Sequence, residues 1–241
     1  PLDEGVVTPK EKRPTEILGN QASLSKGLFQ VTDRETVGPS FAGTSGNFLY
    51  LLRENGHAFE WSATTSRLEK REVSKTDLLG VINATWSSEG DKLVAELFSQ
   101  GKIRHFLLNT TAPTASLFLP EGIMQVSWSP SGKEFSASIF QSNKSSVFLF
   151  PSSGKKPTLL YESPIPDLRA FWITSNELVM TTPASGVAQT PLLLLNKNTK
   201  GISLLRGALF GLGFSFSPSG AKVVISQTNQ DGRSLSTTVE D

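Results

Sequence analysis

Histidine and cysteine are common metal ligands, and this chain has few of them. Its 241 residues include two histidines, His57 and His105, and no cysteine. A metal site needs several convergent ligands, and neither histidine belongs to a His-rich or His-x-His pattern. Without cysteine, disulfides and thiolate metal sites are excluded. We interpret both histidines as structural residues of strands or turns, and we predict neither a metal site nor a cofactor.

Serine, glycine and carboxylate patterns predict no catalytic residue. An α/β-hydrolase needs Gly-x-Ser-x-Gly at a strand-to-helix turn, and the two candidates, at 43–47 and 213–217, each lack the final glycine. The glycine-rich stretch 207–213 precedes a strand and opens no helix, so we expect a connecting loop there and not a phosphate-binding loop. The acidic residues are scattered, several of them in turns such as Glu89 and Asp91, which does not favour paired-carboxylate glycosidase chemistry.

Three of the four tryptophans could be a stacking platform for sugars or bases. However, Trp86, Trp128 and Trp172 recur at nearly equal intervals with matching neighbours. Matching positions in a repeat favour packing between structural units. Trp61 lies outside this register, and its role stays open.

Composition excludes several classes of partner. The net charge is +1, with 23 basic and 22 acidic residues, which gives no electrostatic reason to expect nucleic acid or a membrane surface as a partner. No apolar run approaches the roughly 18 residues that a membrane-spanning helix requires, so we predict no membrane insertion by this segment. The chain begins at Pro1, so we expect the native N-terminus, with any signal or anchor, to lie outside it.

A recurring tight turn organises the chain. The stretch Trp-Ser-Pro-Ser-Gly-Lys at 128–133 ends one strand and starts the next, because proline presets one turn angle and glycine tolerates positive φ. Related stretches begin at Phe41, Trp86, Trp172 and Phe216. Successive anchors are 42 to 45 residues apart. A period of about 40–45 residues with several short strands is typical of a β-propeller blade.

One repeat can be divided into strands at 123–129, 133–140, 147–150 and 157–161, and the second of these alternates apolar and polar residues. We therefore predict an all-β fold, a β-propeller with about five readable four-stranded blades. The predicted domains are a polar, flexible N-terminal linker at 1–26 and a propeller at 27–241. The expected repeats lie near 38–80, 81–121, 122–166, 167–208 and 209–241.

The sequence allows two interpretations of how the propeller ring closes. Residues 28–31 have the pattern of a strand that could complete the last blade and close a five-bladed ring. The other interpretation, which we favour slightly, is that the chain is truncated and further blades belong to the native protein.

The Trp-Ser-Pro-x-Gly-Lys pattern resembles the TolB-like branch of WD-repeat-like β-propellers, over about residues 38–240. The family usually has aspartate before the turn glycine, where this chain has Glu89, Ser131 or Ser219, and its usual aspartate-aromatic strand endings are missing here. The resemblance implies a propeller fold and an extracytoplasmic setting at a bacterial envelope.

Two functions follow from this prediction. The leading one is a non-catalytic scaffold that binds a protein or peptide, because propeller function resides in loops around the rim. The alternative is an accessory propeller domain of a larger enzyme, such as a peptidase, whose catalytic domain lies outside this chain. The sequence identifies neither the binding residues nor the oligomeric state.

Overall fold

The structure is a computed structural model that describes residues 32–42, 46–63, 68–185, 188–216, 222–229 and 235–240. Within these ranges, regular structure is antiparallel strand apart from one short 3-10 helix, η1 (Pro113–Ala115). The described part contains no helix with the length and apolar character needed to cross a bilayer. The expected linker at 1–26 and the expected strand at 28–31 lie outside the described residues.

Three four-stranded sheets, here called blades 1 to 3, follow one another with their strands in chain order. Blade 1 contains β1 (Thr36–Ala42), β2 (Asn47–Leu52), β3 (Ala58–Ala63) and β4 (Leu68–Ser74). Blade 2 contains β5 (Val81–Trp86), β6 (Lys92–Ser99), β7 (Lys102–Asn109) and β8 (Leu117–Phe118). Blade 3 contains β9 (Ile123–Trp128), β10 (Glu134–Gln141), β11 (Lys144–Pro151) and β12 (Thr158–Ser163). The four strands expected between 123 and 161 correspond to β9–β12.

The remaining strands form one six-stranded sheet. They are β13 (Arg169–Trp172), β14 (Glu177–Thr181), β15 (Thr190–Asn196), β16 (Ile202–Phe216), β17 (Val223–Thr228) and β18 (Leu235–Glu240). The first part of β16 pairs with β15 and its second part pairs with β17. We call β13–β15 with the first part of β16 blade 4, and the second part of β16 with β17 and β18 blade 5.

The prediction of a connecting loop at 207–213 is wrong, because these residues lie inside β16. Gly211 has φ +54 and falls where the pairing with β17 shifts register, between Phe210 and Gly213. Glycine adopts such angles without steric cost, so the strand can leave one blade and enter the next without a loop.

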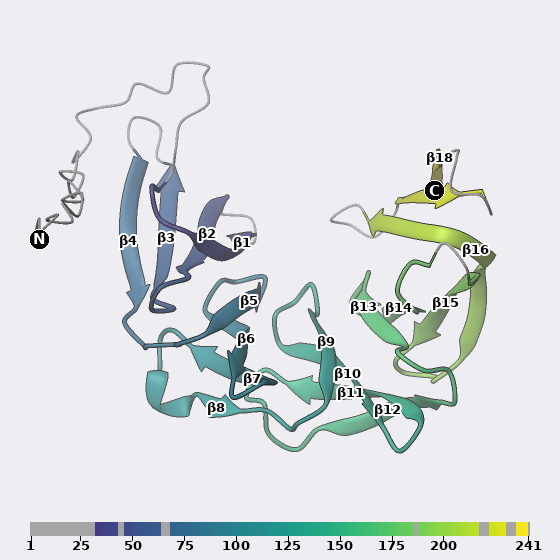
Figure 1. The fold of residues 1–241 in the computed structure, drawn as a ribbon, viewed down its shortest axis with the longest axis horizontal. Coiled ribbons are helices and arrows are strands. Elements are labelled where there is room, and N and C mark those ends of the chain that lie inside the picture. Colours follow the sequence, from purple (N-terminus) through teal and green to yellow (C-terminus); the bar gives the residue numbers. More distant parts are fainter. Residues whose placement is uncertain are drawn as a thin grey trace, which may run out of the picture.

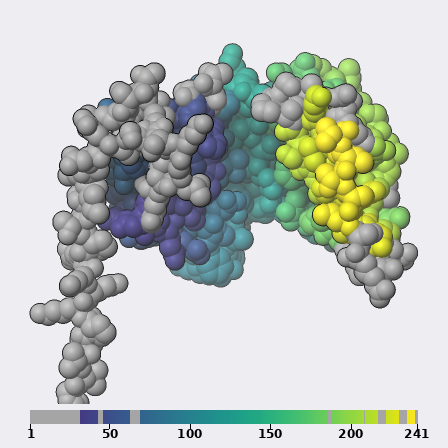
Figure 2. All heavy atoms as spheres, turned by 90° about the horizontal axis from the view of Figure 1, so that it is seen from above, coloured from purple at the N-terminus to yellow at the C-terminus, as the bar shows by residue number. Residues whose placement is uncertain are grey.

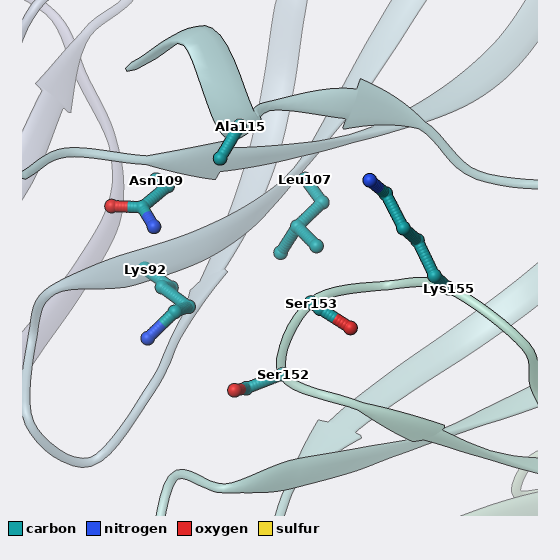
Figure 3. A pocket seen from close by; sticks show the side chains of 7 residues that line it. All are labelled: Lys92, Leu107, Asn109, Ala115, Ser152, Ser153 and Lys155. Carbon is teal, nitrogen blue, oxygen red and sulfur yellow. The ribbon is translucent and has the colours of Figure 1, made fainter. Parts of the chain in front are cut away.

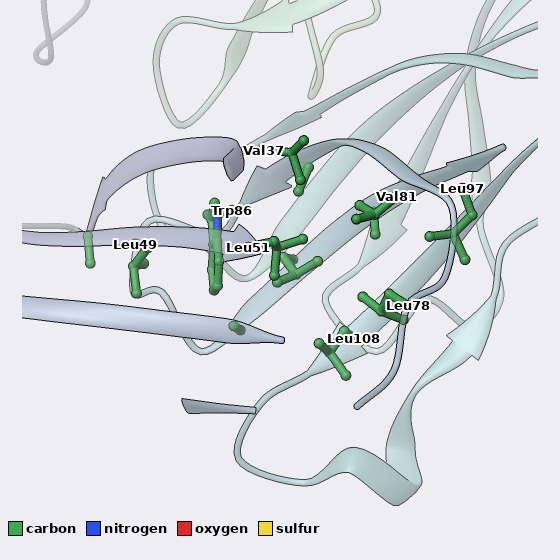
Figure 4. Packing of buried hydrophobic residues seen from close by; sticks show 13 residues of the cluster. Val37, Leu49, Leu51, Leu78, Val81, Trp86, Leu97 and Leu108 are labelled. Carbon is green, nitrogen blue, oxygen red and sulfur yellow. The ribbon is translucent and has the colours of Figure 1, made fainter. Parts of the chain in front are cut away.

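The blades are arranged around an open arc, with β1 at one end and β18 at the other, and the first strand of blades 1 to 4 lies toward the inside (Figure 1). The hydrophobic core is divided into clusters between consecutive blades. Figure 4 shows the first cluster, in which Leu49 and Leu51 of blade 1 pack against Trp86 and its neighbours in blade 2. Each blade is therefore stabilised by its neighbours.

The repeated tryptophans lie at these boundaries. The indole N–H of Trp86 donates to the Gly38 carbonyl at 2.7 Å, and that of Trp128 donates to the Thr85 carbonyl at 2.9 Å. In both cases the acceptor belongs to the first strand of the preceding blade. Trp172 is equally buried, and its backbone N–H donates to Ser127 Oγ of blade 3 at 3.0 Å. These contacts fit the packing role expected for the three residues.

Candidate functional site

One side of blade 1 has no described blade against it. Side chains alternate along a strand, and Leu49 and Leu51 of β2 belong to the core shared with blade 2. Phe48, Tyr50 and Leu52 therefore point to the opposite side. We call this side, turned away from blade 2, the outward face of blade 1.

Strand pairing gathers five aromatic rings on the outward face. Phe48 lies opposite both Phe41 of β1 and Trp61 of β3, and Tyr50 lies opposite Phe59. The ring centroids of Phe41 and Phe48 are 5.5 Å apart, those of Phe48 and Tyr50 are 5.9 Å apart, and those of Tyr50 and Phe59 are 5.7 Å apart. These are ordinary distances for interacting rings, so the set is one continuous apolar surface.

Exposure varies strongly across this surface. Phe41 is 71% exposed, whereas Tyr50 is fully buried. The Tyr50 hydroxyl and the Trp61 indole nitrogen are both buried and have no hydrogen-bond partner among the described residues. Nearly all buried polar groups in proteins are hydrogen-bonded. The outward face therefore combines an exposed ring with two polar groups that still lack a partner.

The outward face occupies the positions by which the other blades meet their predecessors. Phe41 pairs with Phe48 in blade 1 as Trp86 pairs with Leu93 in blade 2. Trp86 and Leu93 are buried against blade 1. Position for position, the aromatic surface is thus one half of an interface between blades.

Charged groups border the rings. His57 Nδ1 lies 2.8 Å from Glu72 Oε1, and His57 Nε2 lies 2.9 Å from Asp77 Oδ1. The Lys70 ammonium lies 4.6 Å from the centroid of the Phe59 ring, within range of a cation–π contact. Across the described ranges, no three His, Asp or Glu side chains are grouped so that they could hold a metal ion. The contacts of His57 with Glu72 and Asp77 therefore form part of the polar edge around the aromatic rings.

A pocket of about 170 Å³ lies between blades 2 and 3 (Figure 3). Its polar groups come from Lys92, Asn109, Ser152, Ser153 and Lys155. The Lys92 ammonium is paired with Asp91, and no histidine or carboxylate lines the pocket to activate a serine. This arrangement lacks the nucleophile–base pair that acyl transfer needs.

The residues weighed for catalysis are dispersed. Ser215 is an exposed residue of β16, and Ser45 lies outside the described residues. Asp91 accepts from the Ser87 hydroxyl at 2.9 Å within the turn between β5 and β6. Among the described residues, neither His57 nor His105 forms a hydrogen bond with a serine. What sequence reasoning missed is the outward face, although five aromatic residues between 41 and 61 were a visible signal.

His105 of β7 is buried, on the side of the strand that also carries Leu107. It is 3% exposed, and its Nε2 has no hydrogen-bond partner in the described part of the chain. Burial lowers the pKa of His105 below its usual value of 6.5, and the nearby Glu96 carboxylate only partly offsets this effect. The native state therefore favours neutral His105, whereas the unfolded chain titrates normally.

This difference predicts a pH dependence of stability. Below about pH 6.5 the unfolded state binds a proton that the native state resists. As the pH is lowered from about 6.5 toward the folded pKa, the free energy of unfolding should therefore decrease by up to about 1.4 kcal/mol per pH unit. Above about pH 6.5 the contribution of His105 to stability is constant. Urea denaturation between about pH 5 and pH 8 measures the slope. Replacement of His105 with leucine should flatten it, and an unchanged slope in His105→Leu would exclude this residue as its source.

The sequence matches no protein-family model and no curated protein. Its fold is similar to that of TolB from Acinetobacter baumannii, with a TM-score of 0.57 and 14% identity over 86% of this chain and 55% of that chain. It is also similar to the β-propeller domain of the Trilobed protease from Pyrococcus furiosus, with a TM-score of 0.55 and 10% identity over 86% of this chain and 70% of that chain.

A third similar structure is the acylaminoacyl peptidase of Pyrococcus horikoshii, with a TM-score of 0.57 and 10% identity over 86% of this chain. This chain spans 55% of the A. baumannii TolB and 38% of the peptidase. At these identities the likeness concerns the fold, and it confirms the all-β prediction. The chain has a β-propeller fold, which it shares with TolB and with the β-propeller domain of the Trilobed protease.

Proposed function

We propose that this chain is a non-catalytic propeller scaffold that binds a protein through the outward face of blade 1. The observation that carries the proposal is a set of interacting aromatic rings, including the exposed Phe41, at positions that form interfaces elsewhere in the same chain. Aromatic residues are enriched in the centres of protein interfaces, and Phe41, which is 71% exposed, is the ring of this face that a partner can reach directly.

The chemistry of this face describes its partner. The rings offer apolar contact, so the partner should present aliphatic or small side chains that fit between them. The Tyr50 hydroxyl and the Trp61 indole nitrogen require polar atoms within the contact. A β-sheet supplies both, as at the boundary between blades 1 and 2, where the Trp86 indole N–H donates to the Gly38 carbonyl of β1. The polar side chains of His57, Glu72 and Lys70 then form the rim.

Replacement of Phe41 with glutamate tests this function. A carboxylate buried without a partner is costly, so Phe41→Glu should weaken partner binding by at least about tenfold, or 1.4 kcal/mol. The measurement is cross-linking and capture of proteins from a bacterial envelope extract, with the wild-type chain and the variant compared by quantitative mass spectrometry.

Phe98 offers a matched control because it is also an exposed phenylalanine, 53% accessible, but lies on blade 2. Phe98→Glu should recover the same proteins as the wild type. If Phe41→Glu also recovers them in equal amounts, the outward face is not the binding surface.

A second function is supported by the similar peptidase structures, of which this fold forms only a part. In this alternative the chain is the accessory propeller of a larger enzyme. Sequencing the native reading frame on both sides of the segment tests it: a hydrolase domain in the same frame would favour the accessory role, and its absence would favour the scaffold.

A further inference from the structure

The pocket between blades 2 and 3 has two sides that different blades supply (Figure 3). One side is the end of blade 2, where Lys92 begins β6 and pairs with Asn109 at the end of β7. The other side is the turn at 152–155, part of the connection from β11 to β12 in blade 3. The pocket is therefore formed by the interior of the arc and not by either of its ends.

This turn is seated closely against blade 2, and both blades lie in the continuous middle of the molecule (Figure 2). The Gly154 N–H donates to the Pro151 carbonyl at 2.8 Å, which closes the turn. Gly154 is buried with φ +71, and a Cβ there would lie 2.7 Å from Leu107 Cδ2. Glycine allows both the angle and the close approach. The turn consequently holds Ser153 and Lys155, on either side of Gly154, at the pocket.

The amide of Asn109, on the opposite side, is fixed in one orientation. Its Oδ1 accepts from the Thr111 backbone N–H at 3.1 Å, from the Thr111 hydroxyl at 2.9 Å and from the Ala112 backbone N–H at 2.9 Å. Backbone N–H groups only donate, so the atom that they surround must be the amide oxygen. The amide nitrogen, which also only donates, lies on the side of Lys92, with the oxygen turned away (Figure 3). Asn109 therefore presents N–H donors to the pocket.

The pocket carries one positive charge that no described carboxylate compensates. The Lys92 ammonium is paired with Asp91, whose other oxygen accepts from the Ser87 hydroxyl, so the charge of Lys92 is neutralised locally. Lys155 is exposed and forms no ion pair with any described residue. No carboxylate belongs to the described lining. The electrostatics of the pocket therefore favour a ligand with a single negative charge.

The rest of the lining is apolar. It consists of Leu107, which is 2% exposed, and Ala115 of η1. A cavity of about 150 Å³ can hold benzene, so a pocket of about 170 Å³ accepts a ligand of similar size. A carboxylate with a chain of a few carbons meets these limits. A phosphate would bring further negative charge and would leave Leu107 and Ala115 without an apolar partner.

We propose that this pocket binds a short aliphatic carboxylate. The carboxylate would accept from the Lys155 ammonium and the Asn109 amide, since hydrogen bonds between charged groups are the strong ones, and the carbon chain would contact Leu107 and Ala115. Such a group belongs either to a free short-chain acid or to the C-terminus of a peptide that ends in a small apolar residue. This inference goes beyond the proposed function, because it involves neither blade 1 nor Phe41.

Titration of the isotope-labelled 241-residue chain with butyrate, followed by NMR, tests the site. Butyrate should shift the backbone amide signals of Ser153 and Lys155 and should saturate. Butyramide has nearly the same shape but no charge, so it should bind at least about tenfold more weakly.

A second ligand separates the two sources of the carboxylate. N-acetylated trialanine with a free C-terminus is compared with its C-terminal amide and with butyrate. If the free peptide binds at least about tenfold more tightly than butyrate and the amide does not, the site takes peptide termini. If the free peptide binds no more tightly than butyrate, the site takes free short-chain acids.

Asn109→Asp is the sharpest variant, because it keeps the oxygen that accepts from Thr111 and Ala112 and replaces the donor nitrogen with a second oxygen. It should weaken butyrate binding at least about tenfold without weakening butyramide binding, and Lys155→Gln should also weaken butyrate binding about tenfold. Lys156→Gln is the matched control, because it removes the same charge from an adjacent exposed lysine outside the lining. It should bind butyrate like the wild type. Urea denaturation of each variant checks that the fold is retained.

Several outcomes would overturn the proposal. One is that butyrate shifts no signal at the pocket or binds no better than butyramide, and another is that its affinity is unchanged in Asn109→Asp. An equal loss in Lys155→Gln and Lys156→Gln would indicate a general attraction of anions to exposed lysines. Phosphate that competes as strongly as butyrate would exclude a role for the apolar lining. None of these results bears on protein capture through Phe41, which is measured separately.

Discussion

Replacement of Phe135 with alanine should lower the free energy of unfolding by about 3–5 kcal/mol. Phe135 is fully buried in the core between blades 2 and 3. Its ring centroid lies 4.9 Å from that of Trp128 and 5.0 Å from that of Phe150, which stacks on it. Truncation removes these contacts and leaves a cavity. Because blade 3 packs against blades 2 and 4, its strands cannot move inward to fill that cavity. Urea denaturation followed by tryptophan fluorescence measures the loss.

The matched control is Phe98→Ala, which deletes the same atoms from an exposed side chain. Surface substitutions of this kind usually change stability by less than about 0.5 kcal/mol. If Phe135→Ala costs no more than Phe98→Ala, the clusters between blades are not what holds the propeller together, and the interpretation of the tryptophan repeat as a packing device would have to be abandoned.

Much of the architecture was predictable because its determinants are local. The turn at 128–133 fixes where β9 ends and β10 begins, and its recurrence at Trp86 and Trp172 sets the spacing of the blades. Glycine and proline requirements are properties of a few consecutive residues, so they can be recognised without knowledge of distant contacts.

The glycine-rich stretch 207–213 shows the limit of local reasoning. The same glycines are compatible with a loop or with a strand that bends, and the choice depends on whether backbone partners are present on both sides. In this chain β15 and β17 supply those partners. Pairing partners outside the stretch itself, in the strands before and after it, decided the outcome.

The candidate site was less predictable for the same reason. Alternation shows that Phe48 and Tyr50 share one side of a strand, but it does not show whether that side meets blade 2 or faces away from it. That assignment follows from the packing of Leu49 and Leu51 against blade 2.

Replacement of Gly80 with alanine should lower the free energy of unfolding by about 2–5 kcal/mol, through two separable effects. Gly80 has φ +77, an angle that side chains with a Cβ rarely adopt. A Cβ at this position would lie 2.4 Å from the backbone oxygen of Phe98. That segment cannot move away freely, because the Phe98 N–H donates to the Gly80 carbonyl at 2.8 Å.

Gly101 separates the two effects within the same blade. Its φ of +75 nearly equals that of Gly80, but a Cβ there would meet nothing within 4 Å. Gly101→Ala should therefore cost only the left-handed conformation, about 1–2 kcal/mol. The difference between the two variants, measured by urea denaturation under identical conditions, isolates the clash with the Phe98 oxygen. Equal losses would mean that the backbone around Gly80 can shift away from Phe98 at little cost. The close approach of Gly80 to β6 would then not be required for the sheet to form.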